Sequence, residues 1–349
     1  MGPGDGDMRV RARGLMNLRA VLAPIAAGMC VMAAAAAVLV PTLGSDAEDD
    51  GPGRGGPSSP AATHRAYGPG AAPASPALAT CTEQNAAESL RPSPDDGAAV
   101  ERIKEKGQLV VGVDQNTYRW GYRDPATGKL EGFDIDLARA IAEDILGPDA
   151  KVVFKAVPTN QRMPALRKRS VDMVVRTMTI NCARKEQVAF STSYFQAGQQ
   201  VLAPKTSKIK AFDDSLRGKR VCTAAGSTGE SELAAQRHGA QVLTVPNQLD
   251  CLVRLQLGEA DAVVTDNALA AAQAAQDPAV ELKGKPFTDE SYGVAMNKDD
   301  TDLVRRVNKV LDDYRGDGGA DSPWMRAYRK WLRADMPGIS GPPSPEYSD

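Results

Sequence analysis

Gly132-Phe133-Asp134-Ile135-Asp136-Leu137-Ala138 opens the stretch of sequence from which the fold can be read. Apolar residues recur beyond it at helical spacing, and this pattern predicts a helix from about residue 134 to 146. Asp134 and Asp136 lie in the first turn, where acidic side chains complement the helix dipole. Phe133 precedes them as a hydrophobic staple. Taken alone, the segment is a well-capped amphipathic helix.

Strand and helix patterns alternate along the chain on both sides of this helix. Strands are predicted at 108–113, 151–157, 171–177, 220–224, 241–245 and 262–265, and helices at 100–106, 134–146, 160–168, 228–237, 249–257, 267–275, 301–314 and 323–332. This alternation indicates βαβ units and an α/β fold with largely parallel sheets. Such sheets bind ligands at the carboxyl ends of their strands, where helix N-termini present free N–H groups.

The first 50 residues carry the marks of export. Four arginines precede an uncharged, Ala-rich run at 20–43, and an acidic cluster follows it. The run is long enough to span a bilayer, and the charge asymmetry places the N-terminus in the cytoplasm. We therefore expect a cytoplasmic basic segment at 1–19 and a membrane anchor at 20–43. A cleaved signal peptide, or a lipoprotein modified at Cys30, are the alternatives.

The remaining chain divides by composition. Residues 44–99 are rich in Gly, Pro, Ser and Ala and should form a flexible linker, because they cannot bury enough apolar surface to offset their ordering entropy. A folded domain is expected at 100–335. Residues 336–349 are polar and Pro-rich and are expected to be a disordered tail.

The composition argues against several classes of function. A net charge of −2 leaves no basic footprint for nucleic acid. The chain has two histidines, His64 and His238, which disfavours a zinc site or a His-based catalytic triad. We expect no nucleic-acid partner, no metal and no cofactor.

Several ordered motifs resemble the family 3 extracellular solute-binding proteins, which bind polar amino acids for ABC importers. Besides the segment at 132–138, the motifs are 172–181 with Arg184 (DMVVRTMTIN followed by R), 216–221 (LRGKRV), 226–229 (GSTG), 258–266 (GEADAVVTD) and 287–293 (FTDESYG). The resemblance covers residues from about 100 to 332. It is strongest to the actinobacterial glutamate/glutamine-binding lipoproteins, whose members often share Asn181-Cys182, Val221-Cys222 and Asp250-Cys251.

This resemblance implies a two-lobed periplasmic-binding-protein type II fold. Each lobe is a mostly parallel sheet flanked by helices. Lobe 1 is expected at about 100–199 and 294–335, and lobe 2 at about 200–293, with crossings near Gln199–Pro204 and 291–297. A ligand that bridges the lobes stabilises the closed form, because it binds that form more tightly than the open one.

Four cysteines besides Cys30 would lie in an oxidising compartment, where disulfides persist. Four cysteines allow three pairings. Cys222 and Cys251 both fall in the second lobe that the resemblance implies, which makes this pair the first choice and leaves Cys81 with Cys182. Free buried thiols are the alternative.

The resemblance also implies which residues hold the amino acid. Arg184 can give a bidentate fork to the α-carboxylate, and Thr179 can add its backbone N–H and hydroxyl. Asp266 can take the α-ammonium. The start of a helix adds an anion site from the N–H groups of Ser227, Thr228 and Gly229. Without the resemblance, the favoured interpretation of Arg184 is a solvated helix residue, and that of Asp266 is an ordinary N-cap.

The residues that read the ligand's side chain are less defined. The family's aromatic wall should correspond to Tyr118 or Trp120, although either could be a packing aromatic. The further polar candidates are Arg176, Thr177, Arg162, Gln115 and Asn116. Alternation along the strand at 171–177 puts Arg176 and Thr177 on opposite faces, so both side chains are not expected in the pocket. Thr177 stands where many family members carry Gly, Ala or Ser, and Arg162 is expected to cap or pair on the surface.

The sequence thus predicts capture of a free amino acid at the extracellular face of the membrane, for delivery to the permease of an ABC importer. Glutamate or glutamine is favoured. The alternative is an amino acid sensor that signals to a transmembrane partner, and neighbouring genes would distinguish the two. A dehydratase-type enzyme on the same fold is less favoured, because no carboxylate base stands out in the pocket.

Overall fold

The structure is a computed structural model that describes residues 80–349. The predicted anchor at 20–43, Cys30 and the predicted linker up to residue 79 lie outside these residues. Between residues 80 and 349, no helix combines the length and the hydropathy needed to cross a membrane.

Lobe 1 is built on a five-stranded sheet with the order β5-β1-β6-β15-β7. The first three strands are parallel, and β15 is antiparallel to both of its neighbours. The strands are β1 (Leu109–Val113), β5 (Val152–Ala156), β6 (Met173–Val174), β7 (Ala189–Phe190) and β15 (Ala295–Met296). A small sheet beside it contains β2 (Asn116–Thr117), β3 (Gly121–Arg123) and β4 (Leu130–Glu131).

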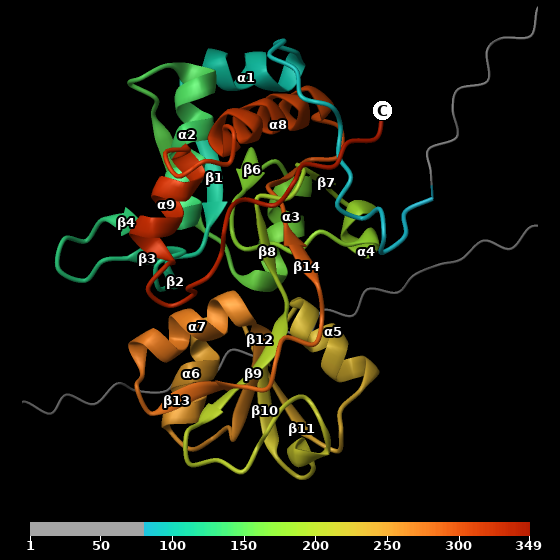
Figure 1. Cartoon of the computed structure of the whole chain (residues 1–349). Coiled ribbons are helices and arrows are strands. Elements are labelled where there is room, and N and C mark those ends of the chain that lie inside the picture. The colour runs from blue at the N-terminus through green and yellow to red at the C-terminus, as the bar shows by residue number, and fades with distance from the viewer. Residues whose placement is uncertain (1–79) are drawn as a thin grey trace, which may run out of the picture. The chain divides into compact units, whose positions relative to one another are not determined.

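Helices surround this sheet (Figure 1), some in contact with its strands and others with neighbouring helices. They are α1 (Ala98–Lys106), α2 (Phe133–Leu146), α3 (Arg162–Arg167) with a 3-10 turn at Thr159–Gln161, α4 (Cys182–Lys185), α8 (Thr301–Arg315) and α9 (Pro323–Trp331). The predicted helix at 134–146 is α2. Its apolar stripe is fully buried, from Phe133 through Ile135 to Ile141. Burial of that stripe against α1, α8 and α9 builds the core of lobe 1.

Lobe 2 repeats the plan with a five-stranded sheet of order β11-β10-β12-β9-β13. The strands β10, β11 and β12 are parallel, and β9 is antiparallel to β12 and β13. The elements are β9 (Gln199–Pro204), a 3-10 turn (Asp214–Leu216), β10 (Arg220–Ala224), α5 (Thr228–Ala235), β11 (Gln241–Val245), α6 (Gln248–Gln256), β12 (Ala262–Asp266), α7 (Asn267–Gln276) and β13 (Val280–Lys283). The predicted two-lobed α/β fold is confirmed.

Two antiparallel strands, β8 (Phe195–Ala197) and β14 (Glu290–Tyr292), run side by side between the two sheets (Figure 1). The crossings therefore lie a few residues before the predicted ones. Gln199–Pro204 is already β9 of lobe 2, because its ladder with β12 begins at Gln199. A Cβ on Gly198 would lie 2.1 Å from the carbonyl oxygen of Thr288, so glycine is needed where the two crossing segments approach each other.

The linker and tail predictions were wrong for the described residues at both ends. The segment before α1 is held to lobe 1, where the hydroxyl of Ser89 donates to the carbonyl of Phe190 at 2.7 Å. The tail returns to the same lobe, and the Tyr347 hydroxyl donates to Asp312 at 2.6 Å. Residues Ser89 and Tyr347 form a parallel bridge. The prediction from composition failed because a few side-chain hydrogen bonds hold these Pro- and Ser-rich segments to lobe 1.

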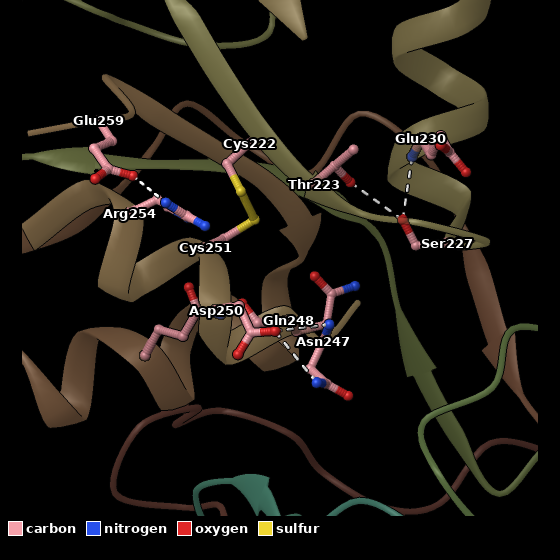
Figure 2. The surroundings of a disulfide bond; sticks show 11 residues. Cys222, Thr223, Ser227, Glu230, Asn247, Gln248, Asp250, Cys251, Arg254 and Glu259 are labelled. Carbon is pink, nitrogen blue, oxygen red and sulfur yellow. Dashed lines mark hydrogen bonds and ion pairs between the residues drawn. A yellow bond between two sulfur atoms is a disulfide. The ribbon is translucent and has the colours of Figure 1, made fainter. Parts of the chain in front are cut away.

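Both disulfides of the first-choice pairing are present, Cys81–Cys182 and Cys222–Cys251. The first ties the segment before α1 to the start of α4. The second joins β10 to α6 (Figure 2), and both of its cysteines are fully buried. Because Cys251 lies one turn after Gln248, this bond fixes the start of α6 against the sheet.

Candidate ligand-binding site

A pocket lies between the two lobes at the carboxyl ends of their parallel strands. The space between its walls, counted with the solvent at its mouth, is about 230 Å³. It is lined by polar and charged side chains and one leucine: Thr159, Arg162, Arg176, Thr177, Thr179, Arg184, Ser227, Thr228, Gln248, Asp266 and Leu269.

Two guanidinium groups of lobe 1 meet one carbonyl oxygen of lobe 2. Arg184 donates to Gly226 O at 3.1 Å and to Thr179 O at 2.7 Å, and Arg162 donates to Gly226 O at 3.3 Å. Burial lowers the pKa of both arginines, and the neighbouring charge of Arg184 lowers that of Arg162 further. Both arginines are buried, so the prediction that Arg162 lies on the surface was wrong. An anion between the two guanidinium groups would relieve their repulsion.

The amino end of α5 faces this pair from lobe 2. Ser227 is the N-cap, and its hydroxyl accepts from the backbone N–H of Glu230 and lies 3.1 Å from the Thr223 hydroxyl (Figure 2). Thr228 is the first helical residue. The N–H groups at the start of a helix are suited to an anion, so the anion site predicted from the sequence stays a prediction at this position.

Asp266 ends β12 and precedes α7, but its side chain makes no capping bond to that helix. Its carboxylate instead accepts from the side chain of Gln199 and faces the pocket. Burial and the nearby carboxylate of Glu290 raise the pKa of Asp266. A buried carboxylate that does not cap its helix is available for a cationic group.

Arg176 and Thr177 both line the pocket, contrary to the prediction from strand alternation. The strand β6 ends at Val174, so the alternation stops before these residues. Thr177 has a φ of 41°, in the left-handed region, and its N–H donates to Asp134 at 3.0 Å. Arg176 is ion-paired with Asp114 at 2.8 Å.

Sequence reasoning missed three of the lining residues, Thr159, Gln248 and Leu269. Thr159 Oγ1 and Gln248 Oε1 are buried without a hydrogen-bond partner, which suits atoms that bind a ligand. Thr159 follows the carboxyl end of the parallel strand β5, and Gln248 follows that of β11. Because parallel sheets bind ligands at the carboxyl ends of their strands, the sequence could have predicted both residues. Leu269 lies in the first turn of α7 and carries no sequence signal.

The other predicted residues lie elsewhere. Trp120 packs in the core of lobe 1 against Phe133 and Phe195, because the chain turns inward before β3. Gly229 lies behind the pocket wall, where a Cβ would be 2.7 Å from Gln199 Oε1. Three residues that follow β1 in the chain also lie outside this pocket: Gln115, Asn116 and Tyr118. Of these, Asn116 and Tyr118 line a second, narrower gap between the lobes.

Comparison with known proteins identifies the family. Residues 109–334 match the bacterial extracellular solute-binding proteins, family 3. The glutamine-binding protein of a Bacillus subtilis ABC transporter is 38% identical over 259 residues, which cover 74% of this chain and 93% of that protein. A glutamine-binding protein of Geobacillus stearothermophilus is 38% identical over 244 residues, covering 67% of this chain and 92% of that protein.

A solved structure supports the same assignment. An ancestral arginine-binding protein bound to glutamine superimposes with a TM-score of 0.60 at 38% identity, and the match covers 65% of this chain and 98% of that one. The family match, the relatives and the fold agree. The chain belongs to the bacterial extracellular solute-binding proteins of family 3.

Proposed function

We propose that this protein captures a polar amino acid outside the cytoplasm, with glutamate or glutamine favoured, and delivers it to the permease of an ABC importer. The observation that carries the proposal is one interlobe pocket that holds buried guanidinium groups and a buried carboxylate. A free amino acid needs both, because it carries an α-carboxylate and an α-ammonium. The lobes bind the ligand between them, and we expect no chemical conversion of it.

The clamp follows from the placement of the charges. Arg184 would hold the α-carboxylate by a charge-assisted fork, with the N–H groups at the start of α5 on its other side. Arg162 would share that carboxylate, since it donates to the same Gly226 carbonyl as Arg184. Asp266 would hold the α-ammonium from lobe 2. Ligand and closed form then stabilise each other, because these groups come from both lobes.

A polar side chain on the ligand fits the rest of the pocket. Thr159 Oγ1, Gln248 Oε1 and Arg176 Nε are buried there without hydrogen-bond partners. Together they offer donors and an acceptor to a terminal carboxylate or carboxamide. The positive charges of Arg162 and Arg184 disfavour a cationic side chain such as that of arginine. The glutamine-binding relatives support the same choice.

A thermal-unfolding screen against the twenty amino acids tests this proposal. A ligand at 100 times its Kd should stabilise the protein by about 2.7 kcal/mol. We expect the largest rise in Tm with glutamate or glutamine and none with arginine. If no amino acid raises the Tm, the proposed function is wrong.

A further inference from the structure

Glu290 is a buried carboxylate that the proposed clamp does not use. It opens β14 at the hinge and is 5% exposed. Its Oε2 accepts hydrogen bonds from the hydroxyls of Thr179 at 2.6 Å and Thr228 at 3.0 Å, and its Oε1 accepts from Thr288 at 3.1 Å. A buried carboxylate is costly unless its oxygens are hydrogen-bonded, and three hydroxyl donors meet that need here.

The two donors to Oε2 come from different lobes. Thr179 precedes α4 in lobe 1, and Thr228 opens α5 in lobe 2. Both residues also line the ligand pocket, on the side where the anion site is formed. One oxygen atom therefore joins the two walls of the pocket. If the lobes rotate apart about β8 and β14, the two hydroxyls separate and Oε2 loses one of them.

The same network reaches the opposite end of the ligand site. Gln199, the first residue of β9, donates from Nε2 to Thr228 Oγ1 at 2.9 Å and also to Asp266 Oδ1. Its backbone N–H donates to Thr288 Oγ1 at 2.7 Å. Gln199 thus connects Thr228, beside the expected carboxylate site, with Asp266, the expected ammonium site. It also bonds to Thr288, which precedes β14.

We propose that Glu290 is a positioning residue that couples hinge closure to the assembly of the ligand site. It stabilises the closed form by holding Thr179 and Thr228 together, and it orients the backbone that faces the ligand. The identity of the ligand used to test this rests on the proposed function, but the effect on lobe closure does not.

The test compares Glu290→Gln with Asp289→Asn. Asp289 is the matched control because it is the adjacent carboxylate on the same hinge segment, is exposed, and bonds only to Gln196 among the described hydrogen bonds. Small-angle X-ray scattering of the ligand-free protein reports closure, and stopped-flow Trp fluorescence with glutamate and with glutamine reports the dissociation rate.

For Glu290→Gln we expect a larger radius of gyration without ligand. We also expect dissociation about ten- to a hundredfold faster, the usual effect of losing a hydrogen bond to a charged group. Asp289→Asn should behave like the unmodified protein. Scattering and dissociation rates for Glu290→Gln that match those of Asp289→Asn would overturn the proposal.

A second pair of variants covers the case in which Glu290→Gln does not fold. Thr228→Val removes one hydroxyl donor and should reproduce the faster dissociation, whereas Thr228→Ser keeps the hydroxyl and should restore the original rate. Equal rates for these two variants would also overturn the proposal. If the unmodified protein binds no amino acid, the proposed function fails, and the ligand-free scattering of the same variants still decides the role of Glu290.

Discussion

The guanidinium of Arg176 lies 2.8 Å from the carboxylate of Asp114, and both side chains are almost completely buried. Asp114 also accepts from the backbone N–H groups of Gln115 and Asn116 and from the Thr117 hydroxyl. The loop after β1 thus neutralises one of the three arginines that line the pocket. We therefore expect that pair to set the charge that a ligand's side chain meets.

Asp114→Asn should shift the preference of the pocket from glutamine toward glutamate. The change leaves the Arg176 guanidinium uncompensated, which favours an anionic side chain by about tenfold or more. Loss of one partner of a buried pair should also lower the free energy of unfolding of the ligand-free protein by about 3–5 kcal/mol. Titration calorimetry with both amino acids measures the ratio. Asp149→Asn, at an exposed position of lobe 1, is the control, and an unchanged glutamate-to-glutamine ratio would contradict this role.

Arg184→Ala should abolish detectable amino acid binding, because it removes the fork to the α-carboxylate and leaves that charge without a strong partner. We expect a loss of at least about 3 kcal/mol of binding free energy, or more than a hundredfold in Kd. Arg167→Ala is the matched control, since Arg167 is exposed and bonds to Gln187 outside the pocket. Retained binding in Arg184→Ala would rule out the clamp.

Ligand binding should release a proton from Asp266. Burial and the Glu290 carboxylate raise the pKa of Asp266 in the ligand-free protein, so part of the population holds a proton there near neutral pH. The ligand's ammonium stabilises the ionised form, so the affinity should increase as the pH rises through that range. Calorimetry in buffers of different ionisation enthalpy counts the protons. Asp266→Asn should bind weakly, and proton-neutral binding by the unmodified protein would refute the link.

Asp134 should make the stability of the protein fall as the pH rises from about 4 to 7. Burial raises the pKa of Asp134 to about 7, above the ordinary value of 3.8. Between those values the folded state binds more protons than the unfolded state, so this contribution is complete below pH 4 and is lost as the pH passes 7. Asp134→Asn should flatten urea-unfolding free energies over that range by on the order of 2–4 kcal/mol. Identical pH profiles would contradict the assignment.

Replacing both Cys222 and Cys251 by alanine should lower the free energy of unfolding by about 3–4 kcal/mol, because the bond closes a loop across 29 residues of sequence. Amino acid affinity should fall as well, since the bond fixes the start of α6 where Gln248 enters the pocket. Urea unfolding and calorimetry test the two effects separately. A variant of unchanged stability would show that α6 is held by packing alone.

The sequence by itself predicted the fold and the favoured disulfide pairing, and it supplied charged candidates for a ligand site. The amphipathic pattern of a helix such as α2 depends only on the local spacing of apolar residues, so it can be recognised from the sequence alone. The motifs around Arg184, Thr228 and Asp266 mark carboxyl ends of strands, which a βαβ order brings to one edge of each sheet. Those three residues line one pocket, as that order implies.

Only the tertiary structure decided which further side chains reach the ligand site. Arg176 and Thr177 share the pocket because β6 stops early and Asp134 holds Thr177 at a positive φ, a contact between residues 43 apart in sequence. Trp120 is drawn into the core by packing against the hinge. Glu290 gains its role because Thr179 and Thr228, which belong to different lobes, meet at its carboxylate. Such contacts depend on chain geometry over long separations, which no local pattern of residues records.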